Sequence, residues 1–343
     1  MSLLSPAADP RVAIAQLGAW LGQDEPADPL LITTSGSTGA PKRVVLSRAA
    51  VVASVEASAE RLGAQGRWLL ALPSSYVAGV QVVVRSLVAG HQPVVVADLD
   101  LEAAVSSAPT STLFTSLVPT QLHRLLADDR QVAALRALHT ILLGGGPIDP
   151  DLRARAEEQG LRIVATYGAS ETAGGCVYDG RPLDGVSVDV GADGRIRIGG
   201  PTIFSGYADD PALTARTLVD GSYVTSDIGR IDEQGRLHVL GRADDVVVSG
   251  GVKIPLPAVA ARLRQHPALE QVEVLGVEDA EWGSRVVAFV VGEVALDEVR
   301  DWVGSEHPRT WAPQQVVALD LLPLLANGKV DREALRGLLG ARP

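Results

Sequence analysis

From about residue 29 to residue 145, short apolar segments alternate with longer segments of helical periodicity. The apolar segments, rich in valine and leucine, are predicted to be strands: LLIT, RWLLALP, QPVVVAD, STLFTS and HTILLGGG. The intervening segments predicted to be helices are residues 47–63, 77–90, 117–127 and 149–159. This alternation is typical of α/β layers around a largely parallel sheet.

After about residue 175 the pattern changes. Short segments such as VSVDVG, GRIRIGG, GSYVTSD and GRLHVLGR are separated by glycine and aspartate turn signals, which predicts antiparallel β-structure. A smaller mixed region follows GRADD, residues 241–245. We therefore predict an α/β protein with a large N-terminal domain of layered α/β sheets, a β-rich subdomain, and a small α+β C-terminal domain.

Composition excludes several classes of protein. The 343 residues are 46% hydrophobic and 21% charged, which predicts a soluble globular protein of two domains. A net charge of −11 argues against nucleic acid or an anionic membrane as the main partner, since both require concentrated basic surface. The single cysteine, Cys176, excludes an internal disulfide and suits the cytoplasm. We expect no signal peptide, no membrane span and, because HExxH and CxxC pairs are missing, no zinc site.

The stretch TTSGSTGAPKRVVLS, residues 33–47, follows the apolar PLLI and precedes a run with helical periodicity. A loop that offers glycine amides and hydroxyl groups suits a phosphate, and Lys42 supplies positive charge. The common phosphate loop GxxxxGK[ST] is absent. Composition alone leaves two interpretations open: a phosphate site, or a flexible turn, which is the more frequent use of such a loop.

The string TSGSTGAPK closely resembles the signature loop of the adenylate-forming superfamily, which includes acyl- and aryl-CoA ligases, peptide-synthetase adenylation domains and luciferases. The match ends at Arg43, where that family usually has glycine. The resemblance implies that the ATP phosphates are bound by Thr34, Ser35, Gly36, Ser37, Thr38, Gly39 and Lys42.

Two further strings resemble elements of the same family. TYGASET, residues 166–172, is similar to its YGxTE element, which implies that Tyr167 packs against adenine and that Glu171 binds Mg²⁺. LLGGGPI, residues 142–148, is similar to its glycine-rich strand end beside the adenine and acyl pocket. The adenine and ribose positions implied by the resemblance are Gly144, Gly145, Gly146, Tyr167, Gly168 and Asp227.

The segment from Ser222 to Asp245 resembles the family's paired YxTGDxG and GRxDD elements. The match implies that Asp227 accepts hydrogen bonds from both ribose hydroxyls, that Arg242 lies near the ribose and α-phosphate, and that Asp244 is the hinge. LPLLANGKVDRE is similar to the terminal NGKxxR element, whose mobile lysine would be Lys329. The implied catalytic residues are Lys329, Glu171 and Arg242.

The same resemblance implies the domain organisation. An N-terminal adenylate-forming domain would span residues 1–242, a hinge residues 243–245, and a mobile C-terminal domain residues 246–343. After the hinge, the CoA-facing segment keeps Gly250, Gly251 and Lys253. It departs from the family pattern at Pro255, Ala258 and Ala260, which leaves the details of CoA contact open.

The acyl pocket is expected around LPSSYVAGVQVVVRSLVAG, residues 72–90. Arg85 falls in an otherwise apolar helix, where an arginine is most often snorkelling or paired in a salt bridge. A second interpretation comes from the run's resemblance to the o-succinylbenzoate–CoA ligases of menaquinone synthesis, particularly the short actinobacterial kind. Their substrate carries an aliphatic carboxylate, which is activated, and an aromatic one, which needs a partner. The implied acyl-pocket residues are Tyr76, Gly79, Arg85 and Ser170.

The resemblance thus predicts a ligase that uses ATP, CoA and Mg²⁺ to convert a small carboxylic acid first to its acyl-adenylate and then to its thioester. Another small aryl- or acyl-CoA ligase, or an enzyme that loads a carrier protein, is the nearest alternative. A nucleotide-binding protein without catalysis is the alternative from a different class. The sequence leaves a homo-oligomer open.

Overall fold

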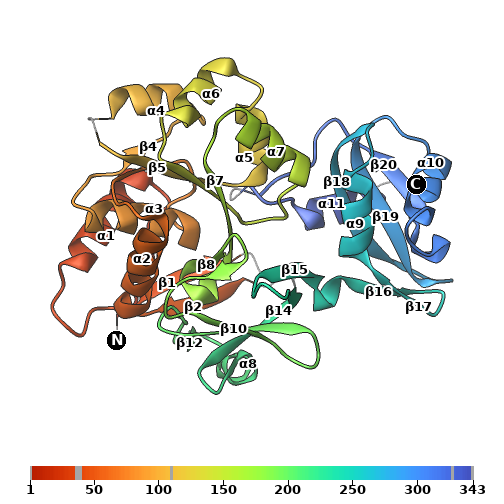
Figure 1. Cartoon of the computed structure of the whole chain (residues 1–343). Helices are drawn as coiled ribbons and strands as arrows, with labels where there is room; N and C mark the ends of the chain where they lie inside the picture. The colour runs from red at the N-terminus through yellow and green to blue at the C-terminus, as the bar shows by residue number, and fades with distance from the viewer. Residues whose placement is uncertain (1, 35–40, 109–110, 326–327, 341–343) are drawn as a thin grey trace.

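The computed structural model describes residues 2–34, 41–108, 111–325 and 328–340 (Figure 1). The central sheet has seven strands in the order β4-β3-β5-β6-β7-β8-β9. The strands β4 to β7 run parallel, and β8 and β9 are antiparallel to their neighbours. These strands are β3 (Arg67–Leu70), β4 (Val94–Val95), β5 (Leu113–Leu117), β6 (Thr140–Leu143), β7 (Ile163–Ala169), β8 (Gly174–Tyr178) and β9 (Arg181–Pro182).

Helices cover this sheet. They are α1 (Pro10–Leu21), α2 (Arg48–Leu62), α3 (Val77–Val88), α4 (Leu101–Ser107), α5 (Pro119–Leu125), α6 (Asp129–Arg136) and α7 (Pro150–Glu158). Two hydrophobic clusters form the core on either side, one around Trp20, Val84 and Tyr178 and one around Leu69, Leu122 and Leu143. Each large apolar side chain buried there contributes about 1.5–3 kcal/mol. The predicted alternation is confirmed, although the sequence did not predict α1, α4 and α6.

One predicted strand belongs to a different sheet. LLIT forms β1 (Leu30–Thr34), which pairs antiparallel with β2 (Lys42–Leu46) and not with the central sheet. The third strand there is β12 (Gly206–Tyr207). The segment after the signature loop is therefore first a strand, in which Val44 and Leu46 are buried. Helix α2 begins after its N-cap residue Ser47, whose hydroxyl accepts a hydrogen bond from the amide of Ala50.

The β-rich part follows, as predicted. Its antiparallel sheet has the order β10-β11-β14-β13, and β15 pairs with β14. The elements are β10 (Ser187–Val190), β11 (Arg195–Gly199), α8 (Pro211–Thr217), β13 (Leu218–Val219), β14 (Ser222–Ile231) and β15 (Leu237–Arg242), after the 3₁₀ helix η1 (Ser170–Thr172). The register of β14 and β15 places Asp227 opposite Arg242.

After the 3₁₀ helix η2 (Ala243–Asp245), a second lobe has its own core, around Val259, Ala288 and Phe289. Figure 1 shows this lobe beside the large one, joined to it through β15. Its elements are β16 (Val246–Ser249), β17 (Val252–Pro255), α9 (Leu256–Arg264), β18 (Leu269–Asp279), β19 (Gly283–Gly292), α10 (Leu296–Gly304), η3 (Arg309–Trp311), β20 (Gln315–Ala318) and α11 (Arg332–Gly340). Within the described residues, no helix is long and apolar enough to cross a bilayer.

Candidate active site

Two glycines shape the exit of β6. A Cβ atom on Gly144 would lie 2.3 Å from Thr166 Oγ1, so only glycine lets the chain leave β6 this close to β7. Gly145 has φ +82°, a conformation that side chains disfavour. Gly168 is equally constrained, because its Cβ would lie 2.1 Å from the carbonyl oxygen of Gly174 on β8. Parallel pairing gives way to antiparallel pairing at this point, and the predicted nucleotide residues of β6 and β7 converge there.

Asp227 is held between two predicted residues. The hydroxyl of Tyr167 donates to Asp227 Oδ2 over 2.7 Å, and Arg242 Nη1 lies 3.6 Å from Asp227 Oδ1. Burial is the main cause that raises the pKa of Tyr167, and the Asp227 charge adds to it, so the hydroxyl stays a neutral donor. The carboxylate is therefore oriented before any ligand binds, and its partly exposed oxygens can accept hydrogen bonds from a pair of hydroxyls.

Glu171 is held in a similar way by a tyrosine that the sequence analysis did not single out. Tyr207, on β12, donates its hydroxyl to Glu171 Oε1 over 2.7 Å, and Glu171 is only 6% exposed. The Lys42 ammonium lies 5.8 Å from the centre of the Tyr207 ring. Tyr207 thus links the phosphate-loop lysine to the acidic residue. Its Gly-Tyr sequence context carries no chemical signature that could have marked it.

Lys329 of the second lobe lies among these residues of the first. Its side chain is so close to the β6 exit that a Cβ on Gly145 would lie 3.8 Å from Lys329 Cε. Burial is the main cause that lowers the pKa of Lys329, the charge of Arg242 lowers it further, and the charges of Asp227 and Glu171 raise it. The structure therefore brings the predicted catalytic lysine to the predicted nucleotide residues, although more than 80 residues of chain separate Lys329 from Arg242.

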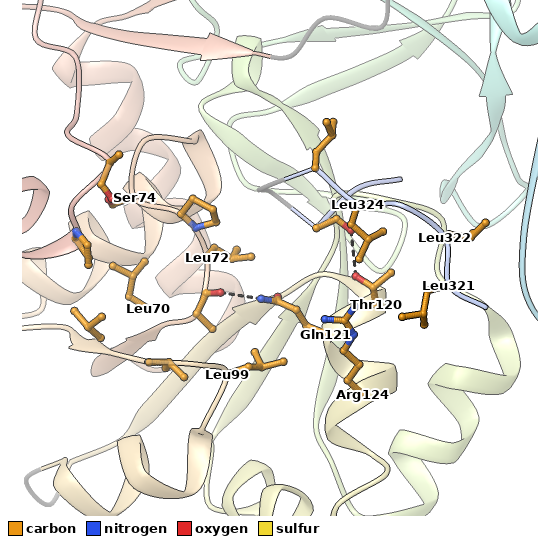
Figure 2. A pocket seen from close by; sticks show the side chains of 18 residues that line it. Leu70, Leu72, Ser74, Leu99, Thr120, Gln121, Arg124, Leu321, Leu322 and Leu324 are labelled. Carbon is orange, nitrogen blue, oxygen red and sulfur yellow. Dashed lines mark hydrogen bonds between the residues drawn. The ribbon is translucent and has the colours of Figure 1, made fainter. Parts of the chain in front are cut away.

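The turn before Lys329 is docked on the large lobe. Thr120 donates its hydroxyl to the carbonyl oxygen of Gly328 over 3.1 Å, beside a pocket of about 530 Å³ (Figure 2). Gly328 has φ +77°, and a Cβ there would lie 2.6 Å from a methyl group of Val118. On the other side of the turn, Arg332 forms ion pairs of 2.8 Å with Asp245 and 2.7 Å with Glu273. Neither Thr120 nor Arg332 was predicted as a site residue.

The signature loop lies between β1 and β2 in the sequence. Thr34 and Lys42, at the end of β1 and the start of β2, are cross-strand partners. The predicted phosphate-binding residues Ser35, Gly36, Ser37, Thr38 and Gly39 lie outside the described residues.

The predicted acyl residues lie along α3 and its contact with β8. Tyr76 precedes α3, and Gly79 packs so tightly that a Cβ would lie 2.1 Å from the carbonyl oxygen of Pro73. Ser170 begins η1, next to Glu171. Arg85 lies near the far end of α3, 6% exposed, and donates to the Tyr178 hydroxyl over 3.2 Å. The structure does not bring Arg85 into the group around Lys329.

The predicted CoA-facing residues lie after η2. Gly250 and Gly251, with φ +55° and +80°, form the turn between β16 and β17, and Lys253 is exposed on β17. Figure 1 shows this hairpin well away from β7 and β8. The backbone of Asp244 lies in η2, and its side chain is outside the described residues.

Glu171 fits a magnesium ion shared with a nucleotide. Mg²⁺ takes oxygen ligands and is commonly held by one or two carboxylates together with substrate phosphates. Across the described residues, no group of three or more His, Cys, Asp or Glu could hold a metal ion alone. The donor set therefore suits an ion that arrives with the phosphates and not a resident metal centre.

Comparison with known proteins identifies the family of this chain. The family model for AMP-binding enzymes matches residues 19–208, and the model for the AMP-binding enzyme C-terminal domain matches residues 258–329. A probable 2-succinylbenzoate–CoA ligase of Mycobacterium tuberculosis is 42% identical over 319 residues, covering 89% of this chain and 83% of the relative. The 2-succinylbenzoate–CoA ligase of Listeria innocua is 30% identical over 319 residues, covering 88% of this chain and 68% of the relative.

Solved structures give the same result. The o-succinylbenzoate CoA synthetase (MenE) of Bacillus subtilis, in complex with the acyl-adenylate intermediate OSB-AMP, superposes with a TM-score of 0.78 at 29% identity, covering 92% of this chain and 69% of that one. The same enzyme in complex with ATP and magnesium ion gives a TM-score of 0.77 at 28% identity, covering 90% and 69%. By sequence, fold and the placement of its charged residues, the chain belongs to the family of AMP-binding enzymes.

Proposed function

We propose that this chain is an AMP-forming acid–thiol ligase that activates o-succinylbenzoate (2-succinylbenzoate) with ATP and transfers the acyl group to CoA. The observation that carries the proposal is the position of Lys329. A cation from the second lobe meets Asp227 and Glu171 of the first, which is the arrangement that joining a carboxylate to an α-phosphate requires. Relatives that are 30–42% identical are named as 2-succinylbenzoate–CoA ligases, which supports o-succinylbenzoate as the acid substrate.

In the first step, a carboxylate oxygen of the acid attacks the α-phosphorus of ATP, and the bond to the β-phosphate oxygen breaks to release pyrophosphate. We assign the ribose hydroxyls to Asp227 and the α-phosphate to Arg242, which lie together on β14 and β15. The loop from Thr34 to Lys42 receives the pyrophosphate. Lys329 approaches the attacking carboxylate and the α-phosphate, and its charge offsets the negative charge that develops as they meet.

Mg²⁺ held by Glu171 would neutralise phosphate charge when the nucleotide is bound. Tyr207 keeps the Glu171 carboxylate oriented through its 2.7 Å hydrogen bond. With one hydrogen bond accepted at Oε1, the Glu171 carboxylate would keep further acceptor capacity for such an ion.

In the second step, the CoA thiolate attacks the acyl carbonyl carbon and AMP leaves. Lys329 lies where the thiol must arrive, so this step needs a different arrangement of the lobes. We place the hinge at residues 243–245 and the moving domain at residues 246–343. Rotation about the hinge would remove Lys329 and bring the hairpin with Gly250, Gly251 and Lys253 toward the acyl group.

The acid would lie along the contact between α3 and β8. The nine residues from Tyr76 to Arg85 rise about 13 Å along the helix, and the four from Gly174 to Tyr178 rise about 13 Å along the strand. Arg85 lies in the last turn of α3, at one end of this line, and we assign the other end to the carboxylate that Lys329 would meet. An acid with one carboxylate on a chain and one on a ring matches that spacing, and we assign the ring carboxylate to Arg85.

A panel of acids tests the function. With ATP and Mg²⁺, the enzyme should release pyrophosphate and form a hydroxylamine-trapped adenylate most efficiently with o-succinylbenzoate, and a thioester only when CoA is added. Higher kcat/KM with another aryl or acyl acid would overturn the substrate. Transfer to a carrier protein in preference to CoA would overturn the acceptor, and release of no pyrophosphate from any acid would overturn the enzyme class. We also expect the protein in the cytoplasm, which fractionation of the source cells would check.

A further inference from the structure

A buried polar cluster joins α2, α3, β3 and β8 at the far end of the proposed acyl line. Arg85 Nη2 donates to the Tyr178 hydroxyl over 3.2 Å, and the guanidinium lies 5.0 Å from the centre of the Trp68 ring. The Tyr178 hydroxyl lies 2.8 Å from Ser58 Oγ. Each of these four residues is at most 6% exposed.

The hydrogen bonds in this cluster have one direction. Arginine has only donors, so the Tyr178 oxygen accepts from Arg85, and its own proton is then directed to Ser58 Oγ. A chain of this kind fixes the guanidinium in one orientation. Trp68, which lies beneath the guanidinium, is itself stacked on Phe114 at 5.0 Å with 17° between the rings.

The cluster contains a positive charge and no negative one. Arg85 is the one arginine among the buried residues of the described chain, and no carboxylate of those residues pairs with it. Its Nε–H has no acceptor there. Burying a guanidinium without an anion costs several kcal/mol, of which a hydroxyl and an aromatic face recover only part. Packing alone would favour a leucine or methionine, so the unpaired charge points to an anionic ligand.

We propose that Tyr178, supported by Ser58, is a positioning residue for recognition of the substrate's ring carboxylate. Its hydroxyl holds the Arg85 guanidinium so that the remaining donors, Nε–H among them, face that carboxylate. Tyr178 acts through Arg85 and does not touch the reacting atoms. The inference rests on the proposed function, since it takes o-succinylbenzoate as the acid and Arg85 as the partner of its second carboxylate.

The test compares two acids that differ by one group. Adenylate formation is measured with o-succinylbenzoate and with 4-oxo-4-phenylbutanoate, which lacks the ring carboxylate. For Tyr178→Phe we expect the KM for o-succinylbenzoate to rise about ten-fold, in line with the loss of one hydrogen bond to a charged group. Its kcat should stay within about two-fold, and the KM values for the monocarboxylic acid and for ATP should not change, because the reacting carboxylate and the nucleotide are bound elsewhere.

Ser58→Ala should raise the KM for o-succinylbenzoate roughly three-fold, since it removes only the hydrogen bond that supports the Tyr178 hydroxyl. Ser54→Ala is the matched control, because Ser54 is equally buried on α2 but its Oγ has no hydrogen-bond partner. It should leave both KM values unchanged. If Tyr178→Phe does not fold, as judged by its Tm, the two serine variants make the same comparison.

An equal change for both acids, or no change for either, would overturn the positioning role. Failure of the proposed function would look different, because the wild-type enzyme would then form no adenylate from o-succinylbenzoate or would prefer the monocarboxylic acid.

Discussion

The two sides of the candidate active site are held in different ways. On the large lobe, Asp227 and Glu171 each accept a hydrogen bond of 2.7 Å from a tyrosine whose pKa is raised mainly by burial. On the second lobe, the described part of the turn before Lys329 accepts a hydrogen bond from the hydroxyl of Thr120 on the large lobe. Arg332, which follows this turn, forms ion pairs with Asp245 in η2 and with Glu273 of its own lobe.

This difference suits a reaction with two steps. In the proposed reaction, the nucleotide residues would hold the adenylate in both steps, and their hydrogen bonds orient them before it binds. The proposed reaction uses Lys329 only in the first step, so its contacts with the large lobe would have to break when the lobes rearrange. The comparison therefore predicts that substitution of a nucleotide residue on the large lobe will affect both half-reactions, whereas substitution of Lys329 will affect only the first.

Removal of the lysine should give the largest effect. We expect Lys329→Ala to lower the rate of adenylate formation about a thousand-fold, because it removes a cation aimed at the charge of the transition state. Thioester formation from supplied acyl-adenylate and CoA should stay near the wild-type rate. Pyrophosphate release measures the first half-reaction, and thioester chromatography the second. Equal loss of both half-reactions would contradict the proposed difference between the two sides of the site.

Asp227→Ala should weaken substrate binding in both half-reactions. Loss of hydrogen bonds to a charged group costs about 1.5–3 kcal/mol, so we expect the KM for ATP to rise roughly ten- to a hundred-fold. The KM for supplied acyl-adenylate should rise by a similar factor, since the ribose is the same in both. Steady-state kinetics of each half-reaction checks this. An effect confined to ATP would show that Asp227 does not hold the ribose throughout.

The pH dependence of adenylate formation should reveal the titration of Lys329. Burial lowers the pKa of Lys329 in the free enzyme, and a lysine is charged only below its pKa. As pH rises through that lowered value, kcat/KM for adenylate formation should fall, at a pH below that of an exposed lysine. Lys329→Arg keeps its charge to higher pH and should move this fall upward. If kcat/KM of Lys329→Arg falls at the same pH as that of the wild type, a group other than Lys329 causes the fall.

Local patterns in the sequence predicted much of the site. Asp227 and Arg242 were expected to act together, and the β14–β15 hairpin makes them cross-strand partners because its register is local. What the sequence missed depends on long-range pairing. Periodicity could not show that LLIT would join β2 in a separate sheet, nor that Tyr207 would reach Glu171 from 36 residues away. The sequence singled out Arg85 as a candidate substrate partner, but its hydrogen-bond partner Tyr178, 93 residues away, was not foreseen.

The smallest effect we predict concerns the contact that docks the lysine turn. Thr120→Val removes the hydroxyl that donates to Gly328 and keeps the shape of the side chain. A neutral hydrogen bond contributes about 1 kcal/mol, so adenylate formation should slow roughly five-fold. Thr120→Ser should restore it. Thioester formation from acyl-adenylate should not slow, because the turn has left Thr120 by then. If Thr120→Val slowed thioester formation as well, the contact would persist through both steps and Lys329 would not be on a detachable arm.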